Sequence, residues 1–167
     1  ALHAATLLGT RNVLVTGDFQ GSIDFGGGPL ASVGVNDAFV VKLDSNGDHL
    51  WSKRFGGAGD QFGRGVATGP SGAVLLAGRF FNTVDCGGGP LPSAGSSDIF
   101  VARLAADGSH VCSQRFGGNS DDWGNDVAVD SLGNALVTGS FRNTVNFGGG
   151  PLVSAGNYDV FALKLSP

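Results

Sequence analysis

The segment Asp44-Ser45-Asn46-Gly47-Asp48 carries the most suggestive spacing of polar side chains in the chain. Asp44, Asn46 and Asp48 alternate along it, as oxygen ligands do in a calcium-binding loop. The matching stretch contains no glutamate that could close an EF-hand loop as a bidentate ligand. We therefore interpret the segment as a hairpin turn, keep these three residues as candidate metal ligands, and expect no cofactor.

The residues that could support catalysis are few and scattered. The histidines are His3, His49 and His110, and we interpret them as surface or strand residues. No Ser/His/Asp or Cys/His set recurs at a motif spacing, and there is no G-x-S-x-G elbow or phosphate-binding loop. The three Gly-Gly-Gly runs precede Pro-Leu instead of opening a helix, which argues against dinucleotide binding. The sequence predicts a protein that is not an enzyme.

Composition limits the remaining classes. The 167 residues include 30 glycines, 41% hydrophobic and 14% charged residues, and the net charge is -4. This much apolar surface at low net charge predicts a folded chain. The acidic balance gives no basic surface for nucleic acid, and the apolar runs are too short for a membrane span. We therefore expect no nucleic-acid partner and no membrane insertion.

An internal repeat of 61 residues organises the chain. Phe25–Leu30 reads FGGGPL, and this run returns as Cys86–Leu91 and as Phe147–Leu152. Aligning 13–57 with 74–118 gives 23 identities in 45 positions without a gap. We divide the single segment 1–167 into units 1–61, 62–122 and 123–167, of which the last is shorter.

Within a unit the apolar residues alternate with period two, which predicts strands. In the middle unit we expect strands near 65–68, 73–80, 98–104 and 110–116, with a glycine-rich loop between the second and third. The third strand is apolar on both faces, so we expect it to lie between neighbouring sheets. The sequence predicts an all-β fold of β-propeller blades, each with four antiparallel strands, and about 2.7 blades in an incomplete ring.

Three stretches carry a resemblance to a known family. They read Phe39–Asp44 (FVVKLD), Trp51–Gly57 (WSKRFGG) and Asp126–Asn134 (DVAVDSLGN), the last leading to Thr138-Gly139. Together they resemble the bacterial β-propeller repeat family of SBBP type, which is found in secreted and surface proteins. The resemblance covers essentially the whole chain and implies a propeller architecture and an extracellular or cell-surface location. It implies no catalytic residues, because the shared positions are turn and strand residues.

The two cysteines lie in one unit and stand where other units have aromatic residues. Cys86 aligns with Phe25 and Phe147, and Cys112 aligns with Trp51. If those positions touch, a disulfide closing a loop of about 26 residues would contribute roughly 3 kcal/mol. We predict a Cys86–Cys112 disulfide, with two buried free thiols as the alternative.

Repeated acids divide into two groups. Asp37, Asp98 and Asp159 recur at the start of the third strand, where we expect each to cap the preceding turn by accepting backbone N–H groups. A second group lies in the connections between units, which emerge at one rim of a propeller and can carry ligands. Our candidate ligand-binding residues there are Asp60, Asp121, Asp122 and the adjacent Trp123.

These observations favour a non-enzymatic scaffold or binding module of an extracellular or cell-surface bacterial protein. A lectin-like propeller with one sugar site per blade is the alternative, suggested by Phe62, Trp123 and Tyr158 beside the rim acids. An enzyme whose active site forms only in a complete ring is a third possibility. Because the third unit ends before a fourth strand, we expect the chain to associate with other copies of itself or with the rest of a longer propeller.

Overall fold

The structure is a computed structural model that describes residues 1–7 and 12–167. The described elements are strands in antiparallel sheets, with one three-residue 3-10 turn at Pro70–Gly72 and no α-helix. Within the same residues, no helix has the length and apolar character of a membrane span. The predicted all-β class is confirmed.

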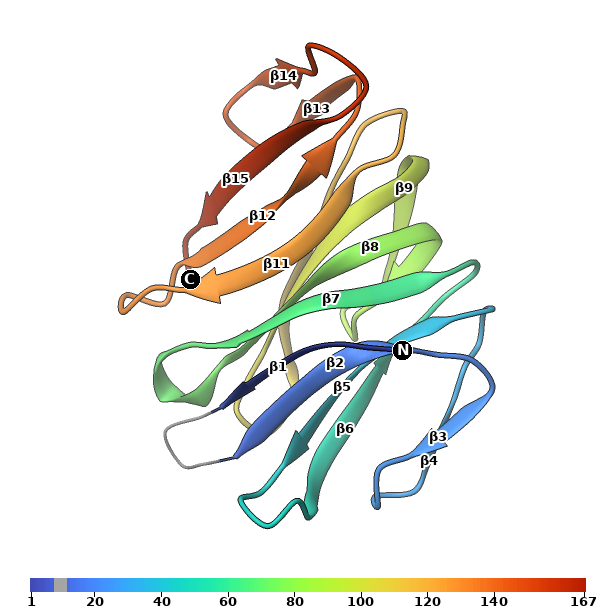
Figure 1. Ribbon diagram of the computed structural model, residues 1–167, viewed down its shortest axis with the longest axis vertical. Helices are drawn as coiled ribbons and strands as arrows, with labels where there is room; N and C mark the ends of the chain where they lie inside the picture. The colour runs from blue at the N-terminus through green and yellow to red at the C-terminus, as the bar shows by residue number, and fades with distance from the viewer. Residues whose placement is uncertain (8–11) are drawn as a thin grey trace.

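Three main sheets follow one another along the chain (Figure 1). The first has the order β1 (Leu2–Leu7), β2 (Val13–Phe19), β5 (Asp37–Leu43) and β6 (His49–Phe55). The second has the order β7 (Gln61–Thr68), β8 (Val74–Asp85), β9 (Pro90–Leu104) and β10 (His110–Phe116). The third contains β11 (Trp123–Val129), β12 (Ala135–Phe141) and β15 (Asp159–Leu165).

Apolar side chains fill the spaces between successive sheets. Ala38 and Val40 of the first sheet share one buried cluster with Phe100 and Leu104 of the second. A further cluster joins the opposite face of the second sheet to the third. Strand β9 contributes to both clusters, so the prediction that this doubly apolar strand lies between neighbouring sheets is confirmed.

The predicted glycine-rich loop in each unit is largely a β-hairpin, which corrects the sequence prediction. In the second sheet the hairpin prolongs β8 and β9, whereas elsewhere it forms β3 (Ser22–Asp24) with β4 (Pro29–Ala31) and β13 (Thr144–Asn146) with β14 (Pro151–Val153). At one tip the Asp85 carboxylate accepts the N–H groups of Gly87 and Gly89, at 2.7 and 3.2 Å. Both glycines have φ of 102°, which explains why the tip is made of glycine.

The predicted turn-capping role of Asp37, Asp98 and Asp159 is confirmed. The Asp37 carboxylate accepts the backbone N–H groups of Val33 (2.9 Å) and Gly34 (3.2 Å). The Asp98 carboxylate accepts the backbone N–H group of Ala94, and the Asp159 carboxylate accepts the backbone N–H group of Ala155. Two of these acids also meet an arginine on the neighbouring strand. Asp37 pairs with Arg54 and Asp98 with Arg115, and both carboxylates are fully buried.

Candidate functional site

The candidate metal ligands belong to the β5–β6 turn. The Asp44 carboxylate accepts the backbone N–H groups of Asn46 (2.7 Å) and Asp48 (2.9 Å), and these bonds hold its pKa below the ordinary value. Gly47 supplies the positive φ of the turn. Over residues 1–7 and 12–167, no three His, Cys, Asp or Glu side chains gather as a metal site would require. The Asp44 carboxylate therefore closes a hairpin turn.

The candidate acids between the sheets hold the connections in place. Asp60 accepts both the backbone and side-chain N–H groups of Asn36, at 3.1 and 2.7 Å. The Asp121 carboxylate accepts the Ser97 hydroxyl at 3.0 Å. These oxygens are therefore engaged by donors of the protein itself.

Asp122 is the most deeply placed of these acids. Its side chain is fully buried and accepts the N–H groups of Gly118 (2.7 Å) and Arg142 (3.0 Å). Burial raises its pKa above the ordinary value. The carboxylate thus joins the connection that enters the third sheet to the end of β12, and it does not reach a surface where a ligand could contact it.

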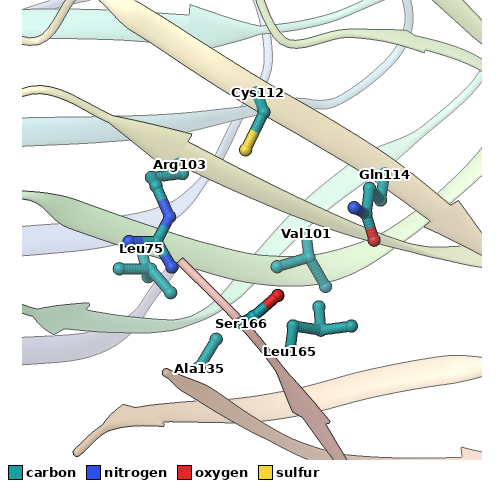
Figure 2. Close-up of a pocket in the computed structure, with 8 residues that line it drawn as sticks. All are labelled: Leu75, Val101, Arg103, Cys112, Gln114, Ala135, Leu165 and Ser166. Carbon is teal, nitrogen blue, oxygen red and sulfur yellow. The ribbon is translucent and has the colours of Figure 1, made fainter. Parts of the chain in front are cut away.

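The predicted disulfide is not formed, because the two cysteines point to opposite faces of the second sheet. Both thiols are free; Cys86 is buried and Cys112 is exposed. Cys86 belongs to the apolar cluster shared with the first sheet. Figure 2 shows Cys112 on the other side, above a small pocket that also includes Ala135 and Leu165 of the third sheet. A disulfide cannot span the sheet without moving the backbone.

The aromatic counterparts explain why the two positions never meet. Phe25 packs on Phe39 on the outer face of the first sheet, with ring centroids 4.9 Å apart. Trp51 lies on the other face, where its indole N–H donates to the Ala106 carbonyl of the second sheet at 3.1 Å. The pocket beside the smaller Cys112 (Figure 2) has a volume of about 30 Å³, which is large enough for a water molecule.

A second pocket, of about 220 Å³, lies between the first and second sheets and contains Cys86 and His110. Burial raises the pKa of the Cys86 thiol to about 12, so it stays protonated and is a poor nucleophile at neutral pH. The His110 ring lies 3.2 Å from the Ser113 hydroxyl, and His49 makes the same contact with Ser52. These histidines are partly buried strand residues that bond locally.

The largest of the described pockets, about 300 Å³, lies where the second sheet meets the third. Its lining residues are Arg64 of β7, Arg79 of β8, and Trp123 and Asn125 of β11. Strand β11 contacts both β7 and β8 at this junction. Of the four candidate ligand-binding residues, Trp123 is the one that lines this pocket.

Backbone bulges aim two of the lining residues. The pairing of β7 with β8 shifts between Gly63 and Gly65, which leaves Arg64 as an extra residue. The pairing of β11 with β12 shifts between Gly124 and Asp126, which leaves Asn125 in the same position. Bulges redirect side chains and are common beside binding sites. The corresponding bulge in the first sheet, between Leu2 and Ala4, bears His3 of β1.

Aromatic rings and a histidine hold the two arginines. The Arg79 guanidinium lies 5.0 Å from the centre of the Phe62 ring and 4.6 Å from that of Trp123. Arg64 lies over Phe62 at 5.2 Å, and its Nη1 is 3.0 Å from Nδ1 of His3. His3 in turn contacts the Asp18 carboxylate. These contacts fix the guanidinium planes before any ligand arrives.

The aromatic residues expected to stack on sugar rings are already engaged by neighbours. Phe62 faces two arginines, and Trp123 packs against Arg79 and against Tyr158, whose ring centre is 5.1 Å away. The Trp123 indole N–H donates to the Ser97 hydroxyl at 3.2 Å. The rings therefore position arginines.

Sequence reasoning identified Trp123 but missed Arg64 and Arg79. The available signal was variation within the repeat: the position of Arg79 holds Asp18 in the first unit and Ser140 in the third. A change of charge at one place in an otherwise shared motif marks a residue that the common architecture does not require.

Two comparisons with known proteins bear on this geometry. Residues 113–140 match the family model of SBBP, described as a beta-propeller repeat, which agrees with the resemblance seen in the sequence. Over 116 residues the chain is 29% identical to the regulatory protein FlaEY of Caulobacter vibrioides. That alignment covers 67% of this chain and 12% of the relative, so the chain spans a small part of the relative's length.

Proposed function

We propose that this chain, which carries an SBBP beta-propeller repeat at residues 113–140, is a segment of a β-propeller in which each main sheet is one blade of a 61-residue repeat. Successive antiparallel sheets packed through apolar faces support this architecture. The first two sheets have four strands each and the third has three. On this proposal the described blades occupy part of a ring.

An exposed apolar face supports the continuation of the ring. Leu75 and Ile99 of the second sheet are 1% and 0% exposed, because the third sheet covers them. Their counterparts in the third sheet, Leu136 and Val160, are 41% and 86% exposed. A following sheet of the same kind, supplied by the rest of a longer polypeptide, would cover this face as the third sheet covers the second.

The function that we assign to the segment is that of a non-enzymatic binding module in an extracellular or cell-surface bacterial protein. The observation that supports this function most directly is the pocket of about 300 Å³, whose lining residues come from two successive sheets. The Cys86 thiol in the pocket between the first and second sheets is a poor nucleophile at neutral pH, because burial raises its pKa to about 12. The proposed location rests on the family resemblance.

A lectin-like function is the second candidate, favoured by Trp123 and Tyr158 at the pocket. Two observations weigh against one sugar site per blade. The positions of Arg64 and Arg79 hold His3 and Asp18 in the first unit and Asn125 and Ser140 in the third. The aromatic faces are also occupied by neighbouring side chains.

A thermal-shift screen of the purified chain against acidic, basic and neutral metabolites, glycans and peptides tests the binding function. A ligand at about 100 times its Kd stabilises the folded state by about 2.7 kcal/mol, which raises the Tm of a chain this size by roughly 5–11 °C. We expect at least one ligand whose shift disappears in Trp123→Ala and persists in Tyr158→Phe.

Two results would count against the proposal. One is the absence of any ligand whose stabilisation depends on Trp123. The other is turnover of a bound ligand, detected by mass spectrometry of the mixture, which would favour an enzyme instead.

A further inference from the structure

Two neighbouring strands of the second sheet bring two positive charges, Arg64 of β7 and Arg79 of β8, to the junction with the third sheet. Over the described residues, the ion pairs involve Arg54, Arg115, Lys164, His3 and the N-terminus, and neither Arg64 nor Arg79 is among them. The chain is acidic overall, with 14 Asp and Glu against 10 Lys and Arg. Within the part of the chain that the structure describes, neither guanidinium charge is therefore neutralised by a carboxylate in direct contact.

Arg79 has an unmet hydrogen-bonding requirement. Its Nε is buried and has no partner among the described residues. Burial, followed by the charge of Arg64, lowers the pKa of Arg79 below its ordinary value, while Asp121, Tyr158 and Asp18 act in the opposite direction. Two adjacent guanidinium groups repel each other, and a bound anion would relieve that repulsion.

We propose that the pocket lined by Arg64, Arg79, Trp123 and Asn125 binds an oxyanion group, a carboxylate or a phosphate, carried by a small organic ligand. The planar guanidinium fork matches both groups through paired N–H donors. Asn125 adds an amide at the same opening, and the Trp123 ring forms a wall. This inference rests on the proposed binding function and names the chemistry of its ligand.

The position of the pocket gives binding a structural consequence. Arg64 and Arg79 come from the second sheet, whereas Trp123 and Asn125 come from the third. An oxyanion held by both arginines and by Asn125 would connect the two sheets at their inner strands. Binding therefore stabilises the junction between sheets in addition to the pocket itself.

Trp123 provides a direct optical probe of the pocket. The chain has two tryptophans, so in a Trp51→Phe background the emission comes from Trp123 alone. We would titrate this protein with sodium phosphate, sodium acetate, glucuronate and neutral glucose at a constant ionic strength of about 0.15 M. We expect a saturable change with one or more oxyanions and none with glucose.

The arginine variants carry the test. Arg64→Gln and Arg79→Gln should each weaken oxyanion binding by about tenfold or more, because each removes charge-assisted hydrogen bonds. The matched control is Lys53→Gln, which makes the same change in net charge on a β6 side chain away from this pocket. It should leave the affinity within about twofold. Far-ultraviolet circular dichroism shows whether each variant is folded. If Arg79→Gln fails to fold, the affinity of Arg64→Gln alone tests the inference.

The outcomes separate this inference from the proposed function. Phosphate binding without acetate or glucuronate binding identifies a phosphate-bearing ligand, and the reverse identifies a carboxylate. No saturable response to any oxyanion, or equal losses in Arg64→Gln and Lys53→Gln, would overturn the inference. Glucose binding that raises the Tm in the thermal-shift assay and that Trp123→Ala abolishes, without oxyanion binding, would also overturn it and would leave the binding module intact.

Discussion

Replacing Asp37 with alanine removes a buried carboxylate that three donors share. It accepts the backbone N–H groups of Val33 and Gly34 and an N–H of Arg54, at 2.9, 3.2 and 3.1 Å, and its side chain is fully buried. Each backbone bond to a charged acceptor contributes about 1.5 kcal/mol. The Arg54 side chain is 33% exposed, so water partly solvates its charge and the ion pair adds no more than about 1 kcal/mol.

The expected loss is therefore about 3 kcal/mol of unfolding free energy, which lowers the Tm by roughly 6–12 °C. Asp159→Ala is the matched control, because the Asp159 carboxylate has one backbone bond, to Ala155 at 2.8 Å, and no ion pair among the described residues. Because water partly solvates this exposed bond, its loss should cost about 1 kcal/mol or less. Urea denaturation followed by circular dichroism measures both. Losses that agree within about 0.5 kcal/mol would refute the reasoning.

Three other perturbations test separate parts of the structure. Without reductant, an alkylating reagent should label the exposed Cys112 quickly. Cys86 should react only on unfolding, because burial raises the pKa of the Cys86 thiol to about 12. A quantitative disulfide in the purified protein would contradict this prediction of two free thiols. Gly78→Ala should cost about 1–3 kcal/mol, because a Cβ there overlaps the Phe62 carbonyl, while Gly156→Ala, in open space, should be nearly neutral by urea denaturation. Hydrogen bonds hold the pKa of Asp130 below its ordinary value of 3.8, so Asp130→Asn should destabilise the folded chain at pH 7. The destabilisation should become smaller as the pH falls below 3.8, and an equal destabilisation at pH 7 and pH 3 would be inconsistent with this account.

The architecture was accessible from the sequence because it depends on features that every unit shares. Residues 98–104 are apolar on both faces, which requires a neighbouring sheet on each side. Strand β9 does have a sheet packed against each of its two faces. Asp37 precedes a strand at the point where a turn needs a carboxylate, and it caps that turn. The hairpins within the glycine-rich segments were missed because their strands are only three residues long in two units, too short for a periodic signal.

The candidate site was only partly accessible because it depends on differences between units. Trp123 was identified as a neighbour of rim acids, yet those acids bond within the protein. Arg64 lies at a bulge, and a strict alternation of faces cannot predict where a bulged side chain points. The disulfide prediction failed for a different reason, because the joint replacement of two aromatic residues does not show on which face of the sheet each one lies.

The exposed face of the third sheet offers the most direct test of the propeller proposal. Sedimentation equilibrium of the purified 16.8 kDa chain measures whether this face needs a covering sheet. If a further sheet normally covers this face, other copies should occupy it in the isolated chain, and we predict concentration-dependent association at about tens of micromolar. A Leu136→Lys, Val160→Lys double variant should shift the chain toward monomer, whereas Leu132→Lys, at an exposed turn residue, should not. A wild-type chain that stays monomeric across this range, indistinguishable from the double variant, would contradict the proposal that a further sheet covers this face.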